Sequence, residues 1–167
     1  MQLTIDPTSE VVAQAKGKIV RYSERMLHLL SFVPDDKLTW TPSPTAKSSL
    51  RIVAHSAVTS KRFADIITGN MPERMPSPEE FFKGLDEAGE KITTRESVIA
   101  LMKETTAELC KALDTVTAAN IDSMPCSPFG AIAMQFWMEE GSAHMAGHTG
   151  QLEYMQTIWG DLDNHLS

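Results

Sequence analysis

Residues 137–159, with the sequence WMEEGSAHMAGHTGQLEYMQTIW, decide the fold. In and around this stretch, the residues expected to face inward recur at spacings of three and four, which is the period of a helix packed in a bundle. The main row is Met134, Trp137, Gly141, His144, His148, Gln151, Met155 and Ile158, and a parallel apolar row is Met138, Met145, Leu152 and Trp159. We therefore predict one long helix from about Gly130 to Trp159, with Gly160 as its C-cap.

The same periodicity predicts three more helices upstream. They cover Val12 to Val33, Ser48 or Ser49 to Gly69, and Thr93 to Val116. Pro34 ends the first helix, because the residue before a proline disfavours helical geometry. A capping box, Thr93-x-x-Glu96, begins the third of these helices. No stretch shows sustained strand-like alternation, so the sequence predicts an all-α fold.

The segment between the second and third helices is long and rich in proline. Residues 70–93 are polar and contain Pro72, Pro76 and Pro78, so we expect a crossover in which Ser77–Glu80 caps one short turn. A connection of this length allows the two helices that it joins to run parallel. The expected architecture is a four-helix bundle with one long crossover, and residues 1–167 form one domain.

Composition excludes several classes of protein. The chain has 167 residues, 15 Lys+Arg against 22 Asp+Glu, and a formal net charge of -7. This balance argues against nucleic acid as a main partner, because such affinity comes mostly from neutralised phosphates. No apolar run reaches the roughly 18 residues that a membrane helix needs, and the N-terminus resembles no secretory signal. With two cysteines and no disulfide framework, we expect a cytoplasmic protein.

Two histidines interrupt the apolar row of the last helix. His144 and His148 are four residues apart on the inward face, so their imidazoles can converge on one metal ion. His55 lies on the inward stripe of the second helix and is the candidate third ligand. Three histidines leave coordination positions open, as in a catalytic or substrate-binding site. The alternative is a set of histidines that form hydrogen bonds in the core or lie at the surface.

The ligand type does not identify the metal, since imidazole suits zinc, nickel and iron alike. Gln151 lies one turn beyond His148 and is predicted either to orient a ligand or to bond to a neighbouring helix. Arg51 and Arg62 lie near the His55 face, where a guanidinium could hold a carboxylate of a substrate or thiol cofactor. We take Arg51, Arg62 and Gln151 as the candidate cofactor-binding residues. Glu140, one turn before His144, is either a base or part of a solvated patch.

Two motifs in this chain resemble the DinB-like superfamily, which includes the bacillithiol transferase and mycothiol-dependent maleylpyruvate isomerase groups. The motifs are Ser48–His55 (SSLRIVAH) and Ala143–Gln151 (AHMAGHTGQ). The resemblance implies a four-helix bundle in which His55, His144 and His148 bind a divalent metal. It also implies a homodimer and, in some members, transfer of a low-molecular-weight thiol to an electrophile.

Two functions from different classes follow. The leading one is a divalent-metal-dependent enzyme acting on a small-molecule substrate, either as a thiol S-transferase or as a hydrolase, depending on whether a thiolate or hydroxide is the nucleophile. The alternative is a non-catalytic bundle that binds a metal or a small ligand. The chain contains no Glu-x-x-His or His-Glu-x-x-His motif, which excludes di-iron carboxylate bundles and zinc proteases of the usual kind.

Overall fold

The computed structural model describes residues 7–166, which are mostly helical. The helices are α1 (Pro7–Phe32), α2 (Ser49–Thr68), α3 (Pro78–Glu90), α4 (Arg95–Leu113) and α5 (Met134–Ile158), with a 3-10 turn η1 (Asp35–Lys37). Two short strands, β1 (Cys126–Ser127) and β2 (Gly130–Ala131), pair antiparallel in a hairpin before α5. The predicted all-α class is confirmed, and periodicity did not indicate this small hairpin.

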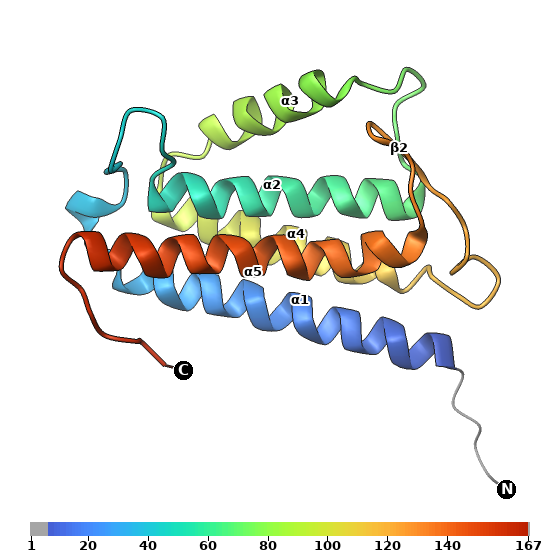
Figure 1. Ribbon diagram of the computed structural model, residues 1–167, viewed down its shortest axis with the longest axis horizontal. Coiled ribbons are helices and arrows are strands. Elements are labelled where there is room, and N and C mark those ends of the chain that lie inside the picture. Colours follow the sequence, from blue (N-terminus) through green and yellow to red (C-terminus); the bar gives the residue numbers. More distant parts are fainter. Residues whose placement is uncertain (1–6, 167) are drawn as a thin grey trace, which may run out of the picture.

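Four of the helices form the bundle (Figure 1). α2 packs against α4 and α5, and α1 packs against the same two helices from the other side. α2 and α4 run in one direction, while α1 and α5 run in the opposite direction (Figure 1). The predicted parallel orientation of the two helices joined by the long crossover is therefore confirmed. None of the helices in residues 7–166 combines the length and apolar character that crossing a membrane requires.

The crossover contains a full helix, so the prediction of one short turn was wrong. α3 packs outside the bundle against α2 and buries Phe81, Leu85 and Gly89. Ser77 accepts a hydrogen bond from the backbone of Glu80, whose carboxylate accepts one from the Ser77 backbone in return. This capping box begins the helix. The buried stripe is only one residue wide per turn and includes glycine, which has low helix propensity, so the periodic signal is weak.

Some predicted helix ends agree with the structure and others differ by a few residues; α1, for example, begins at Pro7 and α4 ends at Leu113. Ser48 and Gly69 cap α2 as predicted, and Gly69 adopts a left-handed φ of 71°. The capping box of α4 uses Thr94 and Ser97, one residue later than predicted. α5 begins at Met134, not near Gly130, because the strand pairing of the hairpin occupies the preceding residues. The C-cap of α5 is Trp159, and Gly160 follows it with a φ of 91°.

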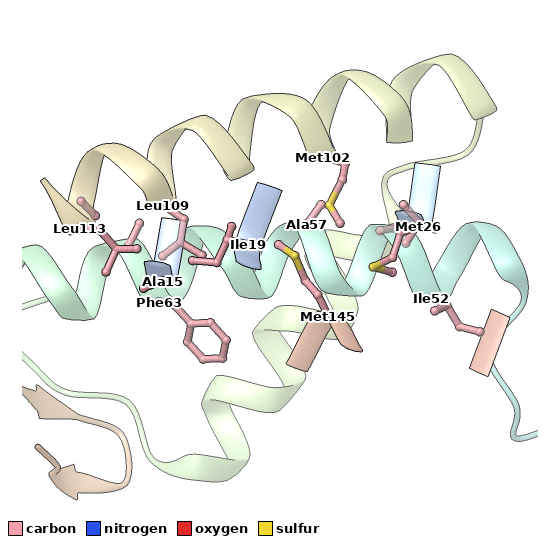
Figure 2. Packing of buried hydrophobic residues seen from close by; sticks show 14 of the residues in the cluster. Ala15, Ile19, Met26, Ile52, Ala57, Phe63, Met102, Leu109, Leu113 and Met145 are labelled. Atoms are coloured by element: carbon pink, nitrogen blue, oxygen red, sulfur yellow. The ribbon is translucent and has the colours of Figure 1, made fainter. Parts of the chain in front are cut away.

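The core lies between the four bundle helices (Figure 2). Met102 from α4 and Met145 from α5 point into it, and both are fully buried. Gly141 lets α5 approach α4 closely, because a Cβ added there would lie 2.8 Å from Leu109 Cδ2. Close packing on this side of α5 leaves no room for a larger side chain. A neighbouring strip of the same inward face of α5 is directed toward α2 and carries His144 and His148.

Candidate metal centre

The structure brings the three predicted histidines together in one cluster. His55 comes from α2, and His144 and His148 come from the antiparallel helix α5. One ring nitrogen of each histidine lies within 4.8 Å of those of the other two. The ring centroids of His55 are 5.2 Å from those of His144 and 5.0 Å from those of His148. Three imidazoles from two helices therefore face a common point.

The closest nitrogens of the cluster are spaced as ligands of one ion would be. His144 Nε2 and His148 Nε2 lie 3.2 Å apart. Two nitrogens each about 2.1 Å from a metal ion are about 3.0 Å apart in octahedral and about 3.4 Å apart in tetrahedral coordination. The observed separation falls between these values. The pair therefore fits a shared divalent ion without rearrangement of α5.

Gln151 fixes the orientation of one histidine, as one of its two predicted roles required. His148 Nδ1 lies 2.7 Å from Gln151 Oε1. Because a carbonyl oxygen only accepts, Nδ1 is the protonated nitrogen and Nε2 keeps its lone pair facing the cluster. This arrangement of an outer partner behind a ligating histidine is usual around metal sites. Gln151 itself is exposed, so it also remains accessible to a bound molecule.

Burial keeps the cluster uncharged. Burial is the main cause that lowers the pKa of His55 to about 4, and the neighbouring His148 lowers it further. Burial, followed by the charges of His148 and His55, lowers the pKa of His144 to about 3. The pKa of His148 is also lowered by burial, although its hydrogen bond to Gln151 acts in the opposite direction. All three rings are therefore neutral at pH 7, which is the form that binds a metal.

Two nitrogens of the cluster are buried without a partner. Among the described residues, no hydrogen-bonding group lies within reach of His55 Nδ1 or His144 Nδ1. A buried polar atom left in this state costs about 1–3 kcal/mol. An imidazole that binds an ion through one nitrogen still needs a partner at the other, so water or a ligand must complete this environment. The donor set fits a divalent ion such as zinc, nickel or iron.

Two pockets open beside the cluster, on different sides. The first has a volume of about 220 Å³ and includes His55, His144 and Glu140 in its lining. Its other walls are mostly aromatic: Phe63, Phe81, Phe82, Phe129, Phe136 and Trp137. The second has a volume of about 400 Å³ and is lined by His148, Gln151 and Lys47 together with the apolar end of α5. Ligands can therefore approach the cluster from two directions.

Glu140 and Trp137 line the first pocket, and Glu140 is half-buried there, while its role as a base stays a prediction. Burial raises the pKa of the Glu140 carboxyl. Trp137 is only 2% exposed, so it belongs to the core as well as to the pocket wall. Sequence reasoning missed Lys47 and the aromatic rings contributed by α3 and the hairpin. No periodic signal could indicate them, because they lie in three different connections between the bundle helices and reach the site only through tertiary packing.

The two arginines predicted to bind a cofactor face other partners. Arg51 Nη2 donates to the backbone oxygen of Asp86 at 3.2 Å and lies 3.5 Å from Glu90 Oε1, which ties α2 to α3. Arg62 is exposed and lies 3.6 Å from Asp65 Oδ2 on its own helix. Within residues 7–166, neither arginine is part of the lining of the two pockets. Their role in cofactor binding stays a prediction.

A helical bundle with convergent histidines facing open pockets defines a class of candidate metalloproteins. The family model of the DinB superfamily matches residues 19–152, and the chain belongs to that superfamily. The match covers the four bundle helices from the middle of α1 to the last third of α5, and all three clustered histidines lie within it. No curated protein matches the chain.

Solved structures support the same fold. A mycothiol-dependent maleylpyruvate isomerase has a TM-score of 0.67 at 16% identity, over 87% of this chain and 60% of that one. A histidine-to-alanine mutant of that isomerase gives a TM-score of 0.66, also at 16% identity and with the same coverage of both chains. A DinB-like protein from Bacillus subtilis has a TM-score of 0.65 at 16% identity, over 90% of this chain and 94% of that one. The chain thus spans about three fifths of the isomerase.

Proposed function

We propose that this protein is a divalent-metal-dependent enzyme that transfers a small thiol to an electrophilic small molecule. The observation that carries the proposal is the convergence of three neutral imidazoles, two of them with buried unpartnered nitrogens, beside two separate pockets. A closed structural site would surround the ion with four protein ligands, whereas three leave a position for a reactant. Two pockets suit a reaction that joins two molecules.

A divalent ion held here would lower the pKa of a thiol or water beside it and so supply a nucleophile near neutral pH. The chain's own residues provide the rest. Gln151 holds His148 in the tautomer that presents Nε2 to the cluster. The half-buried Glu140 carboxyl, with its raised pKa, can accept the proton that the thiol loses and return it to the product. In such an addition the S–H bond of the thiol and one π bond of the acceptor break, a carbon–sulfur bond forms, and the returned proton completes the adduct, so no group leaves.

Hydrolysis is the second candidate reaction, because the same histidines suit hydroxide as the nucleophile. Thiol transfer is favoured by the second pocket, since a thiol cofactor needs a binding site of its own and water does not. Lys47 also lines that pocket, and because its Nζ lies 2.9 Å from Asp86 Oδ1, a carboxylate of the thiol would share this ammonium with Asp86. The DinB-like isomerase whose fold this chain shares is mycothiol-dependent, which also supports a thiol. A non-catalytic metal-binding role is the outcome if metal binds and no reaction follows.

The test is metal content, measured by elemental mass spectrometry on tag-free protein. The variant His144→Ala/His148→Ala removes two clustered histidines. Its matched control, His28→Ala/His165→Ala, removes two histidines that meet each other away from the cluster, where His28 Nε2 lies 3.0 Å from the His165 backbone oxygen. We expect near-stoichiometric metal in the wild type and the control and none in the first variant. Absence of metal from all three after exposure to zinc, nickel and iron would contradict the proposal.

Activity is tested on the metal-loaded protein with a panel of low-molecular-weight thiols and an electrophilic aromatic acceptor. We expect thiol-dependent loss of the acceptor in the wild type and in the control variant. Acceptor loss without added thiol would favour hydrolysis, and metal binding with neither reaction would favour the non-catalytic alternative. The expectations of a homodimer, of a cytoplasmic location and of no nucleic-acid partner stay predictions.

A further inference from the structure

The walls of the first pocket come from four separate parts of the chain, α2, α3, the hairpin segment and α5, and ring contacts join them. Phe129 of the hairpin lies 5.6 Å from Phe81 and 5.7 Å from Phe82, both on α3, between ring centroids. On the opposite side, Phe63 of α2 lies 5.8 Å from Trp137 and 5.7 Å from the His144 ring. α3 and the hairpin therefore form one aromatic wall, and the bundle forms the other next to the histidines.

The mouth of this pocket exposes large rings to solvent. Phe82, Phe129 and Phe136 are 52%, 43% and 46% exposed, although each also contacts another ring of the pocket lining. Several exposed aromatic side chains around one opening are typical of a binding site, because packing alone would bury them. Among the described residues that line the pocket, Glu140 is the single carboxylate, and no lysine or arginine accompanies it. The pocket therefore suits an uncharged, apolar body.

Besides the two histidine nitrogens described above, two further buried polar groups in the lining lack partners. Within residues 7–166, no acceptor or donor is in reach of Thr59 Oγ1 or Trp137 Nε1, although the residues are only 3% and 2% exposed. The hydroxyls of Ser49 and Ser56 on the same helix are also unpartnered, but among the described residues that line the pocket only Thr59 carries such a hydroxyl. Both unpartnered groups can donate a hydrogen bond. An acceptor oxygen on a bound molecule would satisfy them.

The size of the pocket limits the molecule that fits. An apolar cavity of about 150 Å³ is known to bind benzene, so a pocket of about 220 Å³ accommodates one ring with a short substituent. From wall chemistry, size and unpartnered donors together, we propose that this pocket binds the electrophilic substrate and that the substrate is an uncharged single-ring molecule bearing an acceptor oxygen, such as an aryl ketone. This inference rests on the proposed function, and it places the thiol in the second pocket.

The inference is tested by binding, measured by titration in ligand-observed NMR, on both metal-free and zinc-loaded protein. The probes are acetophenone, its isostere ethylbenzene, which lacks the oxygen, and the anion benzoate. We expect acetophenone to bind about 3- to 10-fold more tightly than ethylbenzene, the effect of one or two hydrogen bonds, and at least about 10-fold more tightly than benzoate.

Two sets of variants locate the binding. Thr59→Val keeps the shape of the side chain and removes its hydroxyl, so it should reduce the preference for acetophenone over ethylbenzene without weakening ethylbenzene. Phe82→Ser/Phe129→Ser changes only exposed rings and should weaken both probes about 10-fold. The control Tyr154→Ser alters a ring that is 70% exposed in the second pocket, and it should leave both probes unchanged.

Equal binding of benzoate and acetophenone, or binding unaffected by the loss of Phe82 and Phe129, would overturn the inference. Its failure can be separated from failure of the proposed function. Stoichiometric metal with no probe binding would leave the metal centre standing and remove this pocket as the substrate site. Probe binding by a protein that takes up no metal would contradict the proposed metal-dependent activity, while the first pocket would stay a ligand-binding pocket.

Discussion

The two inward sides of α5 differ in what completes them. The side that faces α1 and α4 is closed by protein, since Met138 and Met145 are buried and Gly141 brings the backbone against Leu109. The side that faces α2 contains His144 and His148, which find only part of their partners within the chain. One side contributes stability through close packing. The other has buried nitrogens that no described residue pairs with, so a metal, water or ligand would have to complete their environment.

Polar residues in the core do not by themselves indicate a site. Thr106 Oγ1 donates to Ser23 Oγ at 2.8 Å between α4 and α1, and both residues are buried. That pair is complete, so it needs no ligand. The histidine cluster differs because buried nitrogens on His55 and His144 are left over. Ser49, Ser56, Gln156 and Trp159 also have unpartnered buried atoms, so the informative property is incomplete hydrogen bonding combined with convergence on one point.

The largest effect should come from removing the one ligand that α2 supplies. With His55→Ala, we expect metal affinity to fall on the order of 1000-fold or more, beyond the roughly 10- to 100-fold expected for an outer partner. The measurement is competition with a chromogenic chelator, with His28→Ala as the matched control. Unchanged affinity would show that α5 alone holds the ion and would break the contrast between its two sides.

The closely packed side of α5 is tested by a substitution that leaves a cavity in the core. Met138→Ala should lower the free energy of unfolding by about 3 kcal/mol, because a fully buried side chain is truncated in a closely packed core. Chemical denaturation of the metal-free protein measures this change. Metal affinity should stay within a few-fold of wild type, and Tyr154→Ala, at an exposed position of the same helix, serves as the control. A large loss of metal affinity would mean that the two sides are coupled.

The outer partner of His148 should have a smaller effect. Gln151→Ala removes the acceptor for His148 Nδ1 and should weaken metal binding about 10- to 100-fold, since the ring loses its fixed tautomer. Gln151→Glu retains an acceptor oxygen at this position and should recover most of the affinity. Chelator competition again provides the measurement. Equal loss in both variants would assign Gln151 a role other than holding this tautomer.

The last prediction concerns the pH dependence of stability in the metal-free protein. The folded-state pKa values of His55 and His144 are about 4 and about 3, below the 6.5 of an unperturbed histidine. Between pH 6.5 and these values the unfolded chain binds more protons, so stability is fully present above pH 6.5 and decreases as the pH falls. Denaturation at pH 7 and pH 5 should show this decrease, and His55→Ala/His144→Ala should show less of it. An identical slope in the variant would assign the decrease to other groups.

Much of the fold could be predicted because its signals are local. The caps Ser48 and Gly69 and the period of α5 are properties of short stretches of sequence. The inward stripe also indicated that His55, His144 and His148 would meet. The length of α3 could not be predicted, because its apolar stripe is narrow. The stripe can be recognised as a buried face only once the helix is packed on α2. The aromatic wall escaped prediction for the same reason, because Phe129 reaches Phe82 through the hairpin and not through sequence proximity.

The origin of the clustered histidines in α2 and α5 determines when the site can exist during synthesis. Roughly 90 residues separate His55 from His144, which at typical ribosome speeds of about 5–20 residues per second is roughly 5–20 s of elongation. A nascent chain that ends within α4 holds only one of the three imidazoles. Any metal acquired through the full cluster is therefore acquired after α5 has emerged and docked, so metal loading reports a finished molecule.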